Sequence, residues 1–422
     1  MTGSVMADLK LRDVIADQTH PGLDEVLASR SMTVYAGFDP TADSLHVGNL
    51  SIIMLLRRFQ RFGHKPIALV GGGTGMIGDP SGKEHERQLQ TREEVERKSQ
   101  GLRAVLDRFL TFGEGPSDAA LLDNFDWLGS LNLIEFLRDI GKHFRVQDMV
   151  ARESVKRRLE KQDGISFTEF TYQLLQSYDF WYLFRHHRCE LQVGGSDQWG
   201  TITAGTDLIR ELDGKAAYGI TGHLVTRADG SKFGKSDDGK TVIWLSAEKT
   251  SPFDYYQFWL RSDDRDVMRY VKIFTDLDAT EWPDLERTLR EEPEKRLAHH
   301  RLAFEATALA HGPKEAERAR EAASAAYSGN RSAAAFDAAP TTPVDRSRIE
   351  AGLTAAEAFE MCGLVPSRGE ARRKAQAGAL RINDRRVDDA MAKLTAGDFD
   401  DHGRCVLQFG KQKLHILRID PS

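Results

Sequence analysis

Cysteine is scarce in this chain: its 422 residues contain 3, Cys189, Cys362 and Cys405. Such widely spaced cysteines form neither a disulfide framework nor a paired zinc motif, and they favour a reducing, cytoplasmic location. A run of 18 apolar residues is also missing, so we expect no membrane span. The first twenty residues contain three aspartates and no apolar core, which argues against a secretory signal.

Disorder is excluded by the composition, in which 40% of residues are hydrophobic and 29% are charged. At about 150 residues per domain, a chain of this length folds into two or three domains. The net charge of -6 excludes a protein that binds nucleic acid over its whole surface. The charge is nevertheless uneven, because Arg368–Arg386 contains 7 basic and 2 acidic residues. This local excess indicates one nucleic-acid contact surface, with an ordinary solvated helix face as the alternative.

Strand and helix patterns alternate in the N-terminal part of the chain. Met32–Phe38 and Lys65–Gly73 have the apolar pattern of buried strands, and Asn49–Phe62 between them has helical periodicity. This order predicts a parallel, right-handed crossover. Cys189–Gly195 and Tyr218–Thr226 supply further strands. Ligands of such sheets bind at the carboxyl ends of the strands, so the segments that follow these strands are the candidate site.

The predicted fold class is α/β, with a Rossmann-like parallel sheet in a catalytic domain over residues 1–247. A helical insertion in this domain is predicted at about 84–188. The strand signal then disappears, and an α-helical domain is predicted over 248–330. A proline-containing linker over 331–350 and a small α+β domain over 351–422 complete the chain.

Four local patterns carry chemistry. Gly73–Gly78 matches the dinucleotide fingerprint, but the Asp-Pro that follows breaks the helix that this motif requires, so the match is weak. Pro40–Asn49 follows a strand and enters a helix, where His46 and backbone donors would face an anion. Lys232–Ser236 is a cationic loop next to glycines, and an exposed basic loop is the simpler alternative.

The fourth pattern is a polar stripe on an otherwise apolar helix, Phe167–Phe184. Tyr172, Gln176 and Asp179 are spaced so that they share one face of this helix. A solvent-facing stripe is the usual explanation. The apolar residues around the rest of the helix favour a polar pocket instead.

Taken together, these patterns resemble those of a known family. PTADSLHVGN is similar to the HIGH signature of class I aminoacyl-tRNA synthetases, and KFGKS is similar to their KMSKS signature. With YAGFDPTADSLH, GMIGDPSGK, SFTEFTY and LQVGGSDQWG, the chain resembles the bacterial tyrosyl-tRNA synthetases over nearly its whole length. The C-terminal segment is similar to the RNA-binding module of a small-subunit ribosomal protein.

The resemblance implies roles for individual residues. In the tyrosine pocket, Tyr35 and Asp179 would bind the phenol of the substrate. Asp79, Tyr172 and Gln176 would bind its ammonium group, and Gln198 would lie near its carboxylate. ATP would contact Gly37, Asp39, Thr41, His46, Asn49, Gly194, Asp197 and Lys235. The catalytic groups at the phosphates would be His46, Asn49, Lys83, Arg87, Lys232, Lys235 and Ser236. The basic C-terminal surface would bind tRNA phosphates through Arg368, Arg372, Arg373, Lys374, Arg381 and Arg385.

The implied activity is ATP-dependent formation of tyrosyl-adenylate, followed by transfer of tyrosine to the 3' end of tRNA(Tyr). The attacking carboxylate is already ionised at neutral pH, so the step needs alignment and charge stabilisation rather than a general base. Magnesium is expected with the polyphosphate, and no metal held by the protein itself is expected. The resemblance also implies a homodimer, with no membrane partner.

Two departures from the family pattern leave alternatives open. Asn49 stands where the HIGH signature ends in histidine, which keeps open a synthetase-derived RNA-binding protein without aminoacylation activity. Ala36 replaces a cysteine found in some members and removes only a weak polar contact. A nicotinamide-dependent oxidoreductase rests on the glycine motif alone. A relative that charges tryptophan is disfavoured, because an indole offers one donor to the pair of Tyr35 and Asp179.

Overall fold

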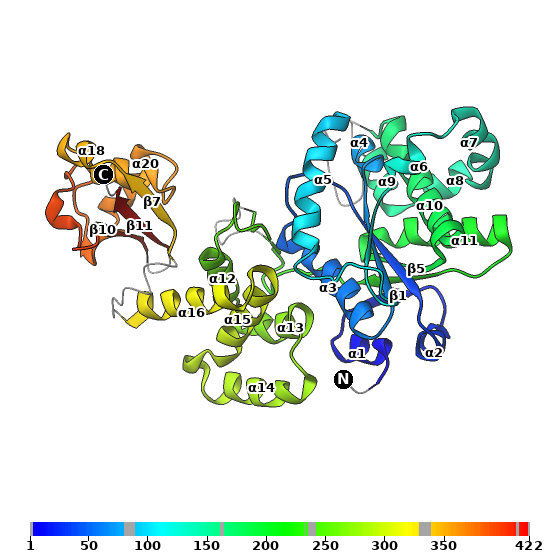
Figure 1. Ribbon diagram of the computed structural model, residues 1–422, viewed down its shortest axis with the longest axis horizontal. Coiled ribbons are helices and arrows are strands. Elements are labelled where there is room, and N and C mark those ends of the chain that lie inside the picture. Colours follow the sequence, from blue (N-terminus) through cyan, green and yellow to red (C-terminus); the bar gives the residue numbers. More distant parts are fainter. Residues whose placement is uncertain are drawn as a thin grey trace. The chain divides into compact units, whose positions relative to one another are not determined.

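The computed structural model describes residues 3–79, 89–160, 164–231, 233–234, 242–328, 339–410 and 413–420. The chain forms two compact units, Met1–Thr250 with Phe258–Gly312, and Ser251–Gln257 with Pro313–Ser422 (Figure 1). Among the described residues, every helix is too short or too polar to cross a bilayer. The predicted domain borders remain predictions.

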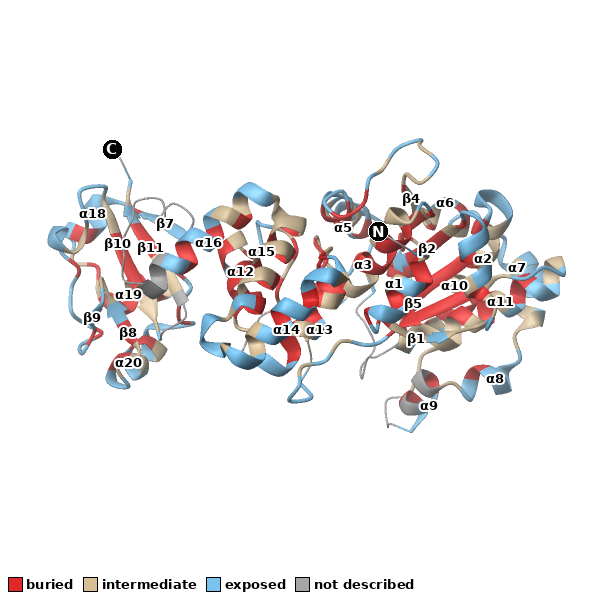
Figure 2. Ribbon diagram, turned by 90° about the horizontal axis from the view of Figure 1, so that it is seen from below, coloured by how far each residue is buried: buried red, intermediate tan, exposed pale blue. Residues whose placement is uncertain are grey.

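A six-stranded sheet forms the centre of the first unit, with strand order β1-β6-β5-β2-β3-β4. The strands are β1 (Ile15–Gln18), β2 (Thr33–Phe38), β3 (Lys65–Val70), β4 (Ala120–Asp123), β5 (Cys189–Gly195) and β6 (Tyr218–Gly222). Neighbours pair in parallel except β1 and β6, which are antiparallel. The α/β prediction with a parallel sheet is therefore confirmed. Strands β2, β3 and β5 are almost wholly buried, as expected for a parallel sheet covered on both faces (Figure 2).

Helices cover this sheet and connect its strands. They are α1 (Val5–Leu11), α2 (Leu23–Ser29), α3 (Val47–Arg61), α4 (Thr74–Ile77), α5 (Arg92–Leu106), α10 (Phe167–His187) and α11 (Trp199–Asp213). Four short helices lie between β4 and α10: α6 (Phe125–Leu128), α7 (Leu133–Asp139), α8 (Val146–Val150) and α9 (Glu153–Leu159). Tyr35, Ile67 and Leu69 of the sheet pack in one buried cluster with Phe180 and Leu183 of α10. Tyr35 and helix α10, to which the sequence analysis assigns candidate site residues, therefore lie together on this face.

Strand β4 adds to the prediction, because it lies within the stretch expected to be a mostly helical insertion. It pairs in parallel with β3 and forms an edge of the sheet. Its four residues are too few to show a periodicity, so the longer helical patterns around it dominated the interpretation. Strand β1 is equally short and was also not predicted.

A helical segment completes the first unit. It contains α13 (Asp264–Phe274), α14 (Trp282–Glu291) and α15 (Leu297–His311), and the preceding α12 (Pro252–Leu260) crosses the border between the units. The side chain of Asp263 caps α13 by accepting from the backbone N–H of Arg265 at 2.9 Å. Helix α13 packs against α3, which connects the helical segment to the sheet.

The second unit contains α16 (Pro313–Ser328) and a five-stranded sheet with strand order β7-β11-β10-β8-β9. Its strands are β7 (Thr341–Val344), β8 (Leu380–Ile382), β9 (Arg385–Arg386), β10 (Arg404–Phe409) and β11 (Lys413–Ile419), with helices α18 (Arg346–Glu350), α19 (Ala355–Met361) and α20 (Arg368–Gln376). Phe359, Leu380 and Leu407 lie in the core between them.

Residues 341–350 differ from the prediction of a linker, because they form β7 and α18. Strand β7 pairs in parallel with β11 at the edge of the sheet, where Pro343 removes no ladder bond from a second neighbour. The proline that suggested a linker is therefore compatible with an edge strand. The linker prediction is corrected at this point.

Candidate active site

A buried pair of polar residues lies at the base of the candidate pocket. Tyr35 on β2 is 1% exposed, and its Oη has no hydrogen-bond partner among the described residues. Its ring lies 5.3 Å from the ring of Phe180, next to Asp179 on α10. Burial, together with the Asp179 carboxylate, raises the pKa of Tyr35 well above its ordinary value. An unpaired buried hydroxyl costs about 1–3 kcal/mol, so this atom is suited to a polar ligand.

The carboxylate of Asp179 is fixed by two donors from the segment after β4. Trp127 Nε1 donates to Asp179 Oδ1 at 2.7 Å, and Asn124 Nδ2 donates to Oδ2 at 2.8 Å. Burial raises the pKa of Asp179 to about 8, although both hydrogen bonds oppose the shift. Sequence reasoning missed Asn124 and Trp127. Their only signal was their place directly after a strand, and that strand was not predicted.

Asn124 also connects the two ends of the candidate pocket. Its Nδ2 lies 3.0 Å from Thr74 Oγ1, and Thr74 Oγ1 donates to Asp39 Oδ1 at 2.9 Å. Tyr172 Oη donates to the other Asp39 oxygen at 3.0 Å. Burial, with the Asp39 carboxylate next in size, raises the pKa of Tyr172 well above its usual range. The network therefore runs from Asp179 to Tyr172 through three other side chains.

Three of the residues expected to bind the ammonium and carboxylate groups of the substrate lie next to one another. Gln198 Nε2 donates to Asp79 Oδ2 at 3.0 Å, and Gln176 Nε2 lies 3.4 Å from Gln198 Oε1. The Tyr172 hydroxyl bonds to Asp39 instead of Asp79. Asp39 and Asp79 place two carboxylates near Tyr172, and an ammonium group would neutralise this negative region.

His46 and Asn49 form the start of helix α3. The backbone N–H of Gly48 donates to His46 Nδ1 at 3.0 Å, and the backbone N–H of His46 donates to Asn49 Oδ1 at 3.1 Å. This capping box requires a neutral imidazole whose proton is on Nε2. The imidazole then carries its N–H at Nε2. Asn49, the departure from the HIGH signature, is thus a structural cap that keeps its amide Nδ2 as a donor.

The KFGKS segment approaches the start of α3. Lys232, Lys235 and Ser236 lie outside the described residues, as do Lys83 and Arg87. Gly234 is described, with a φ of 91°, and a Cβ there would lie 3.2 Å from the backbone N of Gly48. Ile243 N–H donates to Gly234 O at 3.1 Å, and Val47 N–H donates to Ile243 O at 3.0 Å. The structure therefore brings the two signature segments together.

The remaining residues expected to bind ATP lie at the ends of β2 and β5. Gly37 and Thr41 are exposed, and Thr41 N–H donates to Asp39 O at 2.8 Å. Gly194 is buried in β5, and Asp197 is exposed shortly after the end of that strand. Both strands end at the same edge of a parallel sheet, which suits a ligand that crosses that edge.

Comparisons with known proteins identify the family. The profile of the tRNA synthetases class I (W and Y) matches residues 27–328. A tyrosine–tRNA ligase of Roseiflexus castenholzii is 44% identical, with 99% of both chains covered. One of Geobacillus kaustophilus is 47% identical, with 98% of this chain and 99% of the relative covered. This chain belongs to the tyrosine–tRNA ligase family. The inactive RNA-binding alternative and the oxidoreductase alternative receive no support from these relatives.

Solved structures support the same family and fold. A C-terminally truncated mitochondrial tyrosyl-tRNA synthetase of Aspergillus nidulans has a TM-score of 0.67 at 31% identity, covering 76% of this chain and 93% of that chain. A tryptophanyl-tRNA synthetase of Encephalitozoon cuniculi has a TM-score of 0.53 at 14% identity, which shows the fold alone. Class I synthetases use ATP. Among the described residues, no group of three or more metal-ligating side chains comes together.

The basic residues of the C-terminal unit lie on α20 and the β8–β9 hairpin. Five of the six are exposed, and Lys374 is half-buried. Four pair with carboxylates: Arg368 with Glu357 at 2.9 Å, Lys374 with Glu370 at 3.6 Å, Arg373 also with Glu370, and Arg385 with Asp398. Exposed ion pairs of this kind are worth about 0–1 kcal/mol, so a phosphate can compete for these cations.

The raised pKa of Asp179 predicts how stability depends on pH. Because the folded pKa is about 8 and the unfolded value is about 4, the folded chain binds the additional proton between these two pH values. The stabilisation from this proton is complete below about pH 4 and is lost as pH rises through about 8. We expect Asp179→Asn to lose this part of the pH dependence. Urea denaturation of the unchanged protein and of Asp179→Asn, at about pH 5 and about pH 8.5, measures the free energy of unfolding. If this free energy changed equally between the two pH values in both proteins, Asp179 would not be the titrating group.

Proposed function

We propose that this chain attaches tyrosine to tRNA in two steps, and the observation that carries the proposal is the pair of Tyr35 and Asp179. The Oη of Tyr35 has no described partner, and the Asp179 carboxylate is buried and fixed by two donors. A substrate phenol would donate to Asp179 and accept from Tyr35. Phenylalanine would leave both groups buried without that partner, which disfavours it.

The rest of the pocket would hold the backbone end of the substrate. Asp79, with Tyr172 and Gln176, would bind the ammonium group, and Gln198 would lie near the carboxylate. The hydrogen bond of Gln198 to Asp79 at 3.0 Å supports a common site for these two groups. The carboxylate would then attack the α-phosphate of ATP, forming the mixed anhydride and releasing pyrophosphate.

ATP would lie across the edge of the sheet, with its triphosphate at the start of α3. His46 Nε2–H and the α3 N-terminus would donate to the phosphates, together with Asn49. Five groups outside the described residues would complete the phosphate site: Lys83, Arg87, Lys232, Lys235 and Ser236. Gly37, Asp39, Thr41, Gly194 and Asp197 would contact the nucleoside. Magnesium would enter as part of the ATP substrate, held chiefly by its phosphates.

The deciding experiment is tyrosine-dependent exchange of pyrophosphate into ATP, with phenylalanine and tryptophan as parallel substrates. Exchange with tyrosine alone would support both the activation step and the phenol site. Exchange with tryptophan would overturn the assignment of specificity to Tyr35 and Asp179. A folded protein without exchange would overturn the proposed activity.

The C-terminal sheet would bind tRNA(Tyr) and leave activation to the first unit. We expect a chain that ends at Ser328, before β7, to retain tyrosine-dependent pyrophosphate exchange and to lose most tRNA charging. Replacing Arg372 and Arg373 with glutamate should make tRNA binding less dependent on salt, by nearly one unit of log-log slope for each phosphate that is no longer neutralised. A truncated chain without exchange activity would contradict this division.

We further propose a homodimer in which the α7–α8 region meets a second copy. Six large apolar side chains are exposed there and at the start of α10: Leu133 66%, Ile134 70%, Leu137 47%, Val146 64%, Val150 38% and Phe167 76%. Apolar groups gathered on a surface mark protein interfaces. Replacing Ile134 and Phe167 together with aspartate should give a monomer in sedimentation velocity, while an unchanged dimer would contradict this interface. We also propose a cytoplasmic location, consistent with free and buried cysteines at all three positions.

A further inference from the structure

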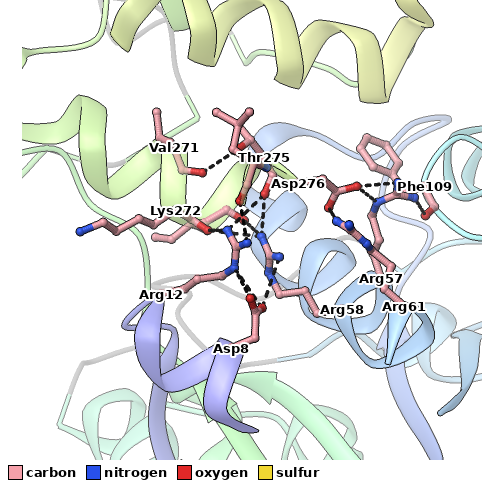
Figure 3. A network of polar contacts seen from close by, with 12 residues as sticks. Asp8, Arg12, Arg57, Arg58, Arg61, Phe109, Val271, Lys272, Thr275 and Asp276 are labelled. Carbon is pink, nitrogen blue, oxygen red and sulfur yellow. Dashed lines mark hydrogen bonds and ion pairs between the residues drawn. The ribbon is translucent and has the colours of Figure 1, made fainter. Parts of the chain in front are cut away.

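Two buried arginines lie where helix α13 ends, and they come from the N-terminal helices of the chain (Figure 3). Arg12 follows α1 and is 4% exposed, and Arg58 on α3 is 2% exposed. Burial lowers the pKa of Arg58 to about 9, with a further contribution from the Arg12 charge. Burying guanidinium groups is unfavourable unless their donors are satisfied. The acceptors of their hydrogen bonds therefore determine what these two arginines stabilise.

The acceptors are the last carbonyls of α13 and of the turn that follows it. Arg12 donates to Lys272 O at 2.9 Å and to Leu277 O at 2.8 Å. Arg58 donates to Thr275 O at 2.7 Å. The carbonyls at the end of a helix have no partner within it and carry the negative end of its dipole, so two cations stabilise them.

The contacts between these arginines and the end of α13 form a joint, and carboxylates pair with arginines on both sides of it. Asp8 on α1 accepts from Arg12 Nε at 2.9 Å and lies 3.5 Å from Arg58. Beyond the helix end, Asp276 is held by Arg57 at 2.7 Å and by Arg61 at 2.5 Å. The C-terminal part of α3 thus holds the end of α13.

The same two helices also contact both signature segments. The other end of α3 carries His46 and Asn49. The side of α13 carries Tyr270 and Phe274, and the ring of Phe233 stacks on Phe274 with centroids 5.2 Å apart and planes at 7°. Tyr270 lies 5.0 Å from the same ring. Phe233 is the second residue of KFGKS, so the position of α13 bears directly on that loop.

We propose that Arg12 and Arg58 are positioning residues for tyrosine activation. They hold α13 in place, α13 holds Phe233 of the KFGKS segment, and the activation step depends on that contact. Neither arginine touches a substrate. The proposal rests on the proposed roles of Lys232 and Lys235 at the triphosphate, and it adds that the helical segment supports the activation step.

The first test is Arg58→Lys, which keeps a charge beside Asp8 and loses the planar fork that reaches the carbonyls. We expect kcat for pyrophosphate exchange to fall by about 10- to 100-fold, because a displacement of about 1 Å can cost about 100-fold in rate. The dissociation constant for tyrosine should stay unchanged, since the proposed tyrosine pocket is built on β2, α10 and the segment after β4. Arg30→Lys is the control, because Arg30 forms an ion pair with Glu190 in the same unit, outside this joint; it should leave kcat unchanged.

The second test is Phe233→Leu, alone and combined with Arg58→Lys. If Arg58→Lys fails to fold, Arg12→Lys takes its place in both tests, because Arg12 holds the same helix end. We expect kcat of the double variant to be no lower than that of the slower single variant. Both substitutions disturb the same series of contacts, from Arg58 through α13 to Phe233. Independent, multiplicative losses, an unchanged kcat in Arg58→Lys, or an equal loss of tyrosine affinity would each overturn the proposal. Lys235→Ala distinguishes the proposed role of the loop at the triphosphate from the proposed positioning role of Arg58. A normal kcat there refutes the loop's proposed role, whereas a low kcat there with a normal Arg58→Lys refutes only the positioning role.

Discussion

Tyrosine-dependent pyrophosphate exchange is expected to fall by about 10- to 100-fold in kcat/KM when Asp179 is replaced by alanine. The substitution removes the acceptor for two buried donors, Asn124 Nδ2 and Trp127 Nε1, and for the substrate phenol. The unpaired Asn124 and Trp127 donors lower stability in the free and the substrate-bound protein alike, so the loss in kcat/KM comes from the substrate hydroxyl. A buried hydroxyl left without its acceptor costs about 1–3 kcal/mol, and about 1.4 kcal/mol corresponds to tenfold in rate. Steady-state exchange at several tyrosine concentrations measures the loss.

Asp213 provides a matched control for this substitution. It also accepts from an indole N–H, that of Trp181 at 2.8 Å, and it pairs with Arg185 at 3.0 Å. Asp213→Ala therefore leaves similar donors unpaired, yet it lies at the end of α11 and outside the candidate pocket. We expect it to lower the free energy of unfolding and to leave exchange close to that of the unchanged protein. Similar losses of exchange in both variants would mean that Asp179 acts only through stability.

Replacement of Gly48 by alanine is expected to reduce kcat for exchange by about 10- to 100-fold, because the imidazole of His46 would be displaced. A Cβ at Gly48 would lie 2.7 Å from Cε1 and 2.8 Å from Nδ1 of His46, so the ring must leave its capping position. The net change in stability should be small, because the helix preference of alanine over glycine, about 0.8–1 kcal/mol, offsets the loss of the His46 cap, about 0.5–2 kcal/mol. Exchange kinetics with varied ATP, together with thermal unfolding, measure both effects.

The control for Gly48 is a glycine near the start of another helix. Gly369 lies in the first turn of α20, and the nearest atom to a Cβ there is Ser367 Oγ at 3.8 Å. Gly369→Ala should leave both exchange and tyrosine binding unchanged. If Gly48→Ala retained normal exchange, the position of the His46 imidazole would not matter for activation.

The signature segments and the local elements that carry them could be predicted from the order of the residues. Strong periodicity predicted α3, β2, β3 and β5, because a long helix or a fully buried strand repeats its apolar residues regularly. The spacing of Tyr172, Gln176 and Asp179 placed them on one face of α10, and the structure connects the first and last of them through one hydrogen-bond network. Charge counting alone placed the basic surface on the C-terminal segment.

The distant residues that support the site are known only from the folded chain. Asn124 and Trp127 reach Asp179 across 55 and 52 positions in the chain, and Arg12 reaches Leu277 across 265. Local pattern cannot predict such contacts, because they depend on which strands are neighbours and on how α13 packs against α3. The short strand β4 shows the same limit: four residues carry too little periodicity, and pairing with β3 stabilises them as a strand. Sheet order and helix packing bring these side chains together, and both are set by burial over the whole unit.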